Sequence, residues 1–301
     1  MVTMRFVISG SSGLIGTSLV QAFSTEGAQV TRLVRSTADA RAADAVRWDP
    51  AQGRLDPQVL AGADAVINLN GRNLGDARWS ERFKERLESS RLEPTRTLVE
   101  AIRRADPPPR LLVNASAAHY YGDRGQVELD ETEPAGDGFL AGLCEDWERA
   151  AREAASEDTR VVVLRFGMVI ARGGALDRLL TPFKLGLGGP IGSGDQWWPW
   201  VAMDDLVGAV QRVLADPKIS GPVNVVSPEA VRSRDFAKAL GRVLHRPAVL
   251  PLPAPAARLM LGEMANELLL ASVRIRPAAL EELGYGFRFP DLEGALRHAL
   301  S

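Results

Sequence analysis

The chain has 301 residues, of which 46% are hydrophobic and 25% charged, a composition typical of a globular protein with a sizeable core. Lys and Arg number 36 against 38 Asp and Glu, so the net charge of −2 gives no reason to expect a nucleic acid or an anionic membrane as partner. The single cysteine, Cys144, excludes an intrachain disulfide and a cysteine-based zinc site, and no metal site is expected. No apolar run approaches the roughly 18 residues of a membrane span, and no leader pattern opens the chain, so a cytoplasmic protein is expected.

Strand and helix patterns alternate through the first half of the chain. The strand candidates are rich in Val, Ile and Leu throughout, which is typical of a parallel sheet covered on both faces. Right-handed crossovers through the helices between them predict an α/β fold with a doubly wound parallel sheet of the Rossmann type. The predicted strands are 5–9, 29–34, 45–48, 65–69, 110–115 and 160–166, and the predicted helices are 14–26, 80–104 and 139–156.

After residue 166 the alternation is looser. Helices are expected at 204–215, 233–244 and 289–300, and a short strand at 223–226. These patterns predict a nucleotide-binding Rossmann domain over residues 1–165. A smaller C-terminal α/β part, residues 166–301, is expected to bind substrate, with some of its segments returning to the sheet.

Three glycines, Gly10, Gly13 and Gly16, follow the first predicted strand and open the first predicted helix. A turn of this kind needs glycine because the chain bends sharply and the backbone approaches a pyrophosphate closely. The N–H groups at the start of the helix then face the anion. The turn therefore predicts a dinucleotide site, and the alternative is a tight βα turn in an ordinary α/β protein.

The end of the second predicted strand distinguishes NADP from NAD. An acidic residue there binds the ribose 2′-hydroxyl of NAD, but this chain has Arg35. A guanidinium can bind a 2′-phosphate through two hydrogen bonds, so NADP(H) is favoured. Arg35 could also be an exposed charge at a strand end, and Arg32 could take its role.

Several motifs along the chain resemble the extended short-chain dehydrogenase/reductases, and within them the atypical epimerase family proteins, the YfcH-like group, which carry their own C-terminal domain. The resemblance covers nearly the whole chain and implies NADP(H) binding without implying a known substrate. The motifs are Asn-Leu-Asn-Gly at 68–71, Arg78-Trp79, Ser90-Arg91, Tyr120-Tyr121-Gly122, the glycine-rich stretch 188–194 and the proline-rich stretch 250–255.

The resemblance also implies which residues meet the cofactor. Arg91 could instead be a surface arginine, and Met168 a core methionine. The residues implied at the pyrophosphate and adenosine are Gly10, Ser12, Gly13, Leu14, Ile15 and Gly16, those at the ribose phosphate are Val34 and Arg35, and those further along are Leu69, Asn70, Gly71, Arg91 and Met168.

The same family uses a Ser or Thr, and a Tyr followed four residues later by Lys, for proton transfer, and this chain departs from that pattern. The Tyr and Lys positions fall on Phe139 and Leu143 in one register and on Leu140 and Cys144 in another. None of these side chains supplies a proton or a cation at the required place. The usual catalytic hydroxyl falls on alanine, one residue after Ser116.

Ser116, His119 and Tyr120 remain as candidates for chemistry near the cofactor, although His119 could equally be a solvated loop residue. Three tryptophans, Trp197, Trp198 and Trp200, could form a wall for a substrate ring or could pack the C-terminal part onto the sheet.

The motifs, together with the missing Tyr and Lys, predict two alternative functions. The first is an NADP(H)-binding epimerase- or oxidoreductase-like protein that acts on a small molecule such as a sugar or a carbonyl compound. The alternative is a catalytically silent NADP(H)-binding sensor or scaffold. The resemblance makes a homodimer possible.

Overall fold

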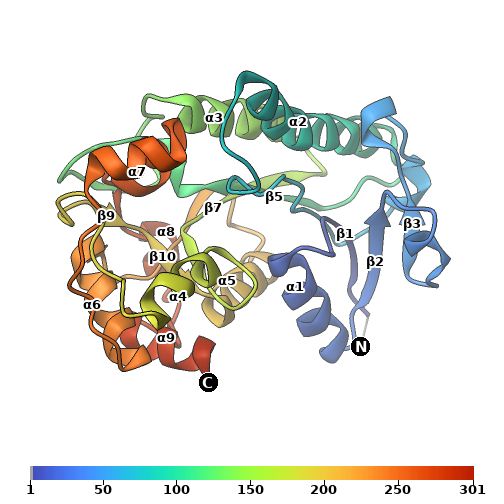
Figure 1. Ribbon diagram of the computed structural model, residues 1–301. Coiled ribbons are helices and arrows are strands. Elements are labelled where there is room, and N and C mark those ends of the chain that lie inside the picture. Colours follow the sequence, from blue (N-terminus) through green and yellow to red (C-terminus); the bar gives the residue numbers. More distant parts are fainter. Residues whose placement is uncertain (1–2) are drawn as a thin grey trace.

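The computed structural model describes residues 3–301, and its centre is a parallel sheet of seven strands (Figure 1). The strand order is β11-β7-β5-β4-β1-β2-β3, so the chain winds outward in both directions from β1. The doubly wound parallel sheet predicted from the sequence is confirmed. The strands are β1 (Arg5–Ser9), β2 (Gln29–Val34), β3 (Ala45–Arg47), β4 (Ala65–Asn68), β5 (Leu111–Ala117), β7 (Arg160–Phe166) and β11 (Gly221–Val225).

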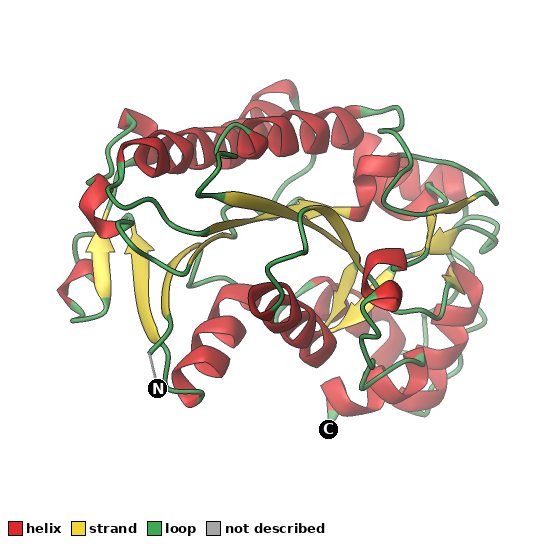
Figure 2. Cartoon of the chain, turned by 180° about the vertical axis from the view of Figure 1, so that it is seen from behind, coloured by secondary structure: helices red, strands yellow, loops and turns green. Residues whose placement is uncertain are grey.

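Helices cover both faces of this sheet (Figures 1 and 2). On one face, α1 (Leu14–Thr25) and α5 (Met203–Ala215) pack on side chains such as Phe6 and Ile8 of β1. On the other face, α2 (Glu81–Arg104) covers Val7 of the same strand, and α3 (Phe139–Arg152) packs beside α2. Alternate residues of β1 thus enter different cores, as period-two geometry requires.

Helix ends agree with local chemistry where the sequence marks them. The Ser80 hydroxyl accepts a hydrogen bond from the Phe83 N–H and caps α2, whose last turn carries Arg103 and Arg104 beside the negative helix end. The predicted helix 139–156 is too long, because α3 ends at Arg152.

The C-terminal half contributes β11 to the large sheet, where it pairs with β7. The rest packs around a second core that includes Trp198, Trp200 and Phe236. No helix within residues 3–301 is long and apolar enough to cross a membrane. The domain division at residue 165 stays a prediction.

The remaining helices are α4 (Ala175–Lys184), α6 (Ser233–Leu244), α7 (Ala254–Leu261), α8 (Ala278–Glu282), α9 (Leu292–Leu300) and a π-helical turn at Ala265–Leu270.

Short strand pairs complete this half. They are β8 (Met168–Ile170) with β10 (Trp200–Ala202), β9 (Trp197–Trp198) with β12 (Val231–Arg232), and β6 (Glu128–Leu129) with β13 (Arg274–Ile275).

Candidate functional site

The glycine turn between β1 and α1 is shaped for a close backbone approach. Gly10 has φ +74°, and a side chain there would place its Cβ 2.7 Å from the backbone of Leu69. A Cβ on Gly16 would lie 2.3 Å from the Gly10 carbonyl oxygen, so neither position tolerates alanine without movement. Gly13 is the N-cap residue that precedes α1, and among the described residues no side chain caps this helix end. The first N–H groups of α1 therefore stay available to an anion.

The side chains beside this turn differ in exposure. Ser12 is exposed, and Leu14 and Ile15 are half-buried. Val34, at the end of β2, is buried. This leaves Ser12 as the polar side chain that a ligand at the helix start can reach.

Arg35 follows β2 and is exposed. It lines a cavity of about 200 Å³ together with Trp48, Asp49 and, from α2, Glu93. The rival candidate Arg32 is committed elsewhere, because its guanidinium binds both carboxylate oxygens of Asp44 at 2.6 and 2.7 Å. Among the described residues Arg35 has no carboxylate partner, and neither has Arg47, which ends β3 and lines the same cavity. Arg35 is therefore the guanidinium at the end of β2 that can bind a phosphate, with a second guanidinium, that of Arg47, in the same cavity.

Buried amides tie together the strand ends that border the site. Asn68 of β4 accepts a hydrogen bond from the Ser9 hydroxyl at 2.9 Å and donates to Thr95 at 2.8 Å and Asn114 at 2.6 Å. The amide of Asn70 also donates to Asn68, at 2.8 Å. The edge of the sheet under Leu69, Asn70 and Gly71 is thus held by β1, β4, β5 and α2.

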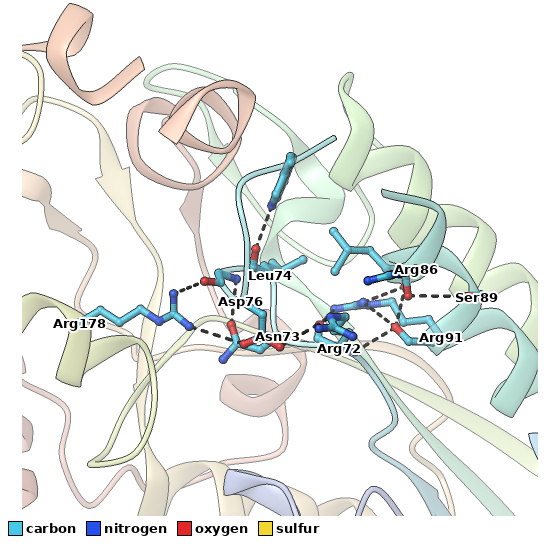
Figure 3. Close-up of polar contacts among 12 residues, drawn as sticks. Arg72, Asn73, Leu74, Asp76, Arg86, Ser89, Arg91 and Arg178 are labelled. Atoms are coloured by element: carbon cyan, nitrogen blue, oxygen red, sulfur yellow. Dashed lines mark hydrogen bonds and ion pairs between the residues drawn. The ribbon is translucent and has the colours of Figure 1, made fainter. Parts of the chain in front are cut away.

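Arg91 of α2 lies under this edge (Figure 3). Its guanidinium donates to the carbonyl oxygens of Leu87 and Arg72 at 2.9 and 3.1 Å, and lies 5.3 Å from the ring centroid of Trp147. A Cβ on Gly71 would lie 3.3 Å from the guanidinium carbon. Burial lowers the pKa of Arg91, and no carboxylate among residues 3–301 pairs with it. A half-buried cation without an acidic partner favours an anionic ligand nearby.

The loop after Gly71 is fixed from two sides (Figure 3). On one side, the Arg72 N–H donates to the Ser90 hydroxyl of α2 at 3.0 Å. On the other, Arg178 of α4 donates to the Gly75 carbonyl and lies 3.7 Å from the Asp76 carboxylate. Nothing in the sequence pattern marks Arg178 beyond its place on an amphipathic helix. The loop therefore joins the sheet edge to the C-terminal half.

Ser116, the first catalytic candidate, is buried near the end of β5. Its hydroxyl donates to Glu148 of α3 at 2.8 Å. Arg165 of β7 binds both oxygens of that carboxylate at 2.9 Å, and Arg152 adds a bond at 2.6 Å. The proton of Ser116 is thus committed to the carboxylate, which leaves its oxygen as an acceptor.

Glu148 and Arg165 belong to none of the motifs predicted to form the site. Both charges stand in otherwise apolar patterns, on the buried side of α3 and within the buried strand β7. Charged residues in such places are almost always paired, and that signal could have found them.

The positions that the family uses for Tyr and Lys are packed with apolar side chains. Leu140 and Leu143 are buried against Phe83 and Leu87 of α2. Cys144 is buried beside Ser116, and burial raises the pKa of its thiol to about 11. A thiol in this state is neutral at physiological pH and is a poor proton donor. Neither register supplies the missing acid/base pair.

His119 and Tyr120 lie in a short 3-10 turn after β5. His119 is half-buried, its Nδ1 has no hydrogen-bond partner among the described residues, and burial lowers its pKa to about 4. The imidazole is therefore neutral at pH 7. The Tyr120 ring lies against Arg165, whose guanidinium carbon is 3.5 Å from the ring centroid. Tyr121 donates to Asn224 and accepts from Arg165, both at 2.8 Å, which is a structural role.

The tryptophans do not gather on one wall. Trp198 and Trp200 are buried in the second core, and their indole N–H groups donate to the carbonyl oxygens of Leu269 and Glu229. Of the two roles expected from the sequence, these two residues have the packing role and not that of a wall for a substrate ring. Trp197 is half-buried, with the guanidinium of Arg232 4.5 Å from its ring centroid.

Two predictions remain, one for Met168 and one for a metal site. Met168 on β8 is half-buried and packs against the second core. Among residues 3–301 no cluster of three or more His, Cys, Asp or Glu is arranged to hold a metal ion.

Residues 6–226 match the sequence pattern described as the NAD dependent epimerase/dehydratase family. The chain belongs to this family. Residues 252–299 match a domain of unknown function, DUF1731. The family resemblance predicted from the motifs is confirmed.

Relatives within the family match along almost their whole length. Epimerase family protein Mb2239 of Mycobacterium bovis is 43% identical over 293 residues, which cover 97% of this chain and 96% of the relative. Epimerase family protein SDR39U1 of Homo sapiens is 37% identical over 302 residues, 99% of this chain and 100% of the relative.

Solved structures agree with this family. The crystal structure of human SDR39U1 (isoform 2) with NADPH has a TM-score of 0.91 at 36% identity and covers 99% of this chain and 100% of that one. A nucleoside-diphosphate sugar epimerase from Corynebacterium glutamicum has a TM-score of 0.81 at 34% identity, with 99% of this chain aligned to 58% of that chain.

Proposed function

We propose that this chain binds NADP(H) along the edge formed by the glycine turn, β2 and β4. Arg35 carries the proposal, because it is an exposed guanidinium without an acidic partner beside a cavity at the ribose end of the site. The steric demand at Gly10 and Gly16 supports a pyrophosphate at the start of α1. The similarity to human SDR39U1, which is crystallised with NADPH, supports the same cofactor.

The cofactor residues divide into three groups along the edge. The helix start and the residues Ser12, Gly13, Leu14 and Ile15 hold the pyrophosphate and adenosine. Val34 and Arg35 hold the 2′-phosphate. Further along, the segment 69–71 holds the central cofactor, Arg91 provides positive charge beside it, and Met168 lies at the nicotinamide end.

The reaction that fits best is an epimerase- or oxidoreductase-like conversion of a small molecule, a sugar or a carbonyl compound. When bound, the cofactor supplies or accepts a hydride. Ser116 offers an oxygen that can accept a hydrogen bond from a substrate hydroxyl, because its own proton is committed to Glu148. His119 is neutral and offers a ring N–H or a lone pair without adding charge. The name of the Corynebacterium glutamicum relative supports a nucleotide-linked sugar as substrate.

The missing Tyr and Lys limit the expected rate. A positioned acid or base contributes about 10²–10⁴-fold to a reaction, and Leu140 and Cys144 cannot supply it. Turnover is therefore slow, with Ser116, His119 or Tyr120 as the groups that remain near the reacting atoms.

The apolar packing at these positions also favours the second function, a catalytically silent NADP(H) sensor or scaffold. Such a protein binds the cofactor tightly and turns over no substrate. A homodimer, a cytoplasmic location and a substrate-binding role for residues 166–301 are further parts of the proposal. For the last of these, Trp197 is the one of the three tryptophans that is half-buried, while Trp198 and Trp200 are buried.

Cofactor oxidation and substrate conversion together separate the two functions. The purified protein is mixed with NADPH or NADP⁺ and a panel of nucleotide sugars and simple carbonyl compounds, in wild type, Ser116→Ala and His119→Ala. Absorbance follows net oxidation or reduction of the cofactor, and chromatography of the products detects an epimerisation, which returns the hydride and leaves the absorbance unchanged. Ser24→Ala is the control, because Ser24 is exposed at the far end of α1. Turnover that falls in either test variant but not in the control supports the enzyme. Tight NADPH binding with no turnover across the panel assigns the sensor.

A further inference from the structure

Four exposed aliphatic side chains gather where two loops of the C-terminal half meet. Leu185 and Leu187 follow α4 and are 69% and 59% exposed, and Val249 and Leu250 follow α6 and are 73% and 50% exposed. The loops are hydrogen-bonded to each other, since the Leu250 N–H donates to the Gly188 carbonyl at 3.2 Å. We call residues 184–188 and 246–250 the α4–α6 loop surface. These loops follow neighbouring helices that pack together at the lower part of Figure 1.

Cations lie in the same two loops as these aliphatic side chains. The stretches 178–194 and 236–262 contain no Asp or Glu, and they hold two and four Lys or Arg residues respectively, of which Arg178 faces Asp76 on the loop after β4. Lys184 and Arg246 are exposed, are joined by a bond from the Arg246 side chain to the Lys184 carbonyl, and have no carboxylate partner among the described residues. The net charge of the whole chain, −2, does not show that these two stretches hold cations and no acidic residues.

The acidic groups nearby neutralise only part of this charge. Arg242 of α6 pairs with Glu293 of α9 at 2.7 Å, and Lys238 lies 3.6 Å from Asp235. A shallow hollow of about 510 Å³ lies beside the surface. It is lined by Lys238, Gly241, Arg242, His245, Arg246, Ala248 and Val249.

We propose that the α4–α6 loop surface binds an anionic membrane surface. Aliphatic side chains on two outward loops can enter the boundary between headgroups and acyl chains, while Lys184 and Arg246 stay at the phosphate level. In the hollow beside them, Arg246 is the Lys or Arg without a carboxylate partner among the described residues, and it can pair with an anionic headgroup.

A second copy of this chain fits the surface less well. A symmetric contact brings the same patch of both copies together, so Lys184 and Arg246 of one copy would face the same cations of the other. Like charges in such a contact oppose association. An acidic protein segment has the right charge, but four protruding aliphatic side chains on two separate loops present no continuous apolar groove for it.

The number of unpaired cations and the number of exposed aliphatic side chains set the expected affinity for the membrane. The surface has few unpaired cations and only four exposed aliphatic side chains, so binding is reversible. It rises with the fraction of anionic lipid and falls with salt, because the attraction to the membrane acts within a Debye length.

Co-sedimentation of the full-length protein with vesicles tests the proposal. The vesicles are pure phosphatidylcholine, or phosphatidylcholine with phosphatidylglycerol, at low and high salt. We expect binding to the anionic vesicles at low salt and little to the neutral ones. Lys184→Gln/Arg246→Gln and Leu185→Ser/Leu187→Ser each lower the affinity about tenfold or more. Val127→Ser is the matched control, since Val127 is 59% exposed outside the surface, and its binding stays at the wild-type level.

Three results overturn the proposal. The first is absence of binding to anionic vesicles by a wild-type protein that still binds NADPH. The second is a wild-type dimer that becomes a monomer in Leu185→Ser/Leu187→Ser by light scattering, which assigns the surface to a second copy. The third is binding of poly-glutamate, but not of vesicles, that is lost in Lys184→Gln/Arg246→Gln, which assigns it to an acidic protein. The proposal does not depend on the cofactor, and unchanged NADPH affinity in the variants shows that they are folded.

Discussion

Replacing Glu148 by Gln should be among the most damaging conservative changes in this chain. Glu148 is fully buried and accepts four hydrogen bonds, two of them from Arg165, whose side chain is 2% exposed. The amide keeps the shape but removes the charge, so Arg165 is left as a buried cation without a counter-ion. Breaking a buried pair in this way costs about 3–5 kcal/mol of unfolding free energy. For a chain of this size the melting temperature falls by roughly 5–8 °C.

Urea unfolding of the wild type and of Glu148→Gln measures this cost. Asp146→Asn is the control on the same helix, because Asp146 is half exposed and pairs with Arg149 at the surface, where a pair contributes at most about 1 kcal/mol. In a double-mutant cycle, Glu148→Leu with Arg165→Met should recover much of the loss, since neither charge is then left alone. A Glu148→Gln cost no larger than that of the control would refute the argument that this pair holds β5, β7 and α3 together.

Two other predictions follow from the same structure. Gly16→Ala places a Cβ 2.3 Å from the Gly10 carbonyl, so we expect a loss of NADPH affinity of about tenfold or more, with Gly142→Ala, where nothing lies within 4 Å, as control; equal affinities in a fluorescence titration would contradict it. His119 has its pKa lowered to about 4 by burial, against an ordinary value of about 6.5, so the unfolded chain binds the proton more tightly. The contribution of neutral His119 to the unfolding free energy is therefore fully present above about pH 6.5, and it falls by roughly 2 kcal/mol between pH 7 and pH 5. Urea unfolding at the two pH values measures this fall, and in His119→Gln the fall should be absent.

The sheet could be predicted from the sequence because its strands are short apolar runs separated by clear breakers. The pattern does not mark the end of a strand where apolar and small residues continue past the last hydrogen bond. The predicted strand 110–115 continues to Ala117, the strand at 223–226 is Gly221–Val225, and those at 45–48 and 65–69 each end one residue early. Pairing decides such ends, and pairing is not local.

The candidate site also has some features that the local sequence predicts and others that depend on contacts between distant residues. The glycine turn and Arg35 are local signals, since a few adjacent residues carry the demand for small size or positive charge. The Glu148–Arg165 pair, the Arg178 contact to the loop after β4 and the burial of Trp198 and Trp200 join residues far apart in the chain. The sequence alone offered two interpretations of the tryptophans, because an aromatic cluster has the same pattern in a core as in a binding wall.

Titration of NADPH and NADH into the purified protein tests the central proposal most directly. Wild type should bind NADPH at least about tenfold more tightly than NADH, because Arg35 pairs with the 2′-phosphate that only NADPH carries. Arg35→Ala should lose that preference while its NADH affinity stays the same, and Arg41→Ala, which removes an exposed charge outside the cavity, should keep it. Equal affinity of the wild type for the two cofactors, or an unchanged preference in Arg35→Ala, would contradict the account.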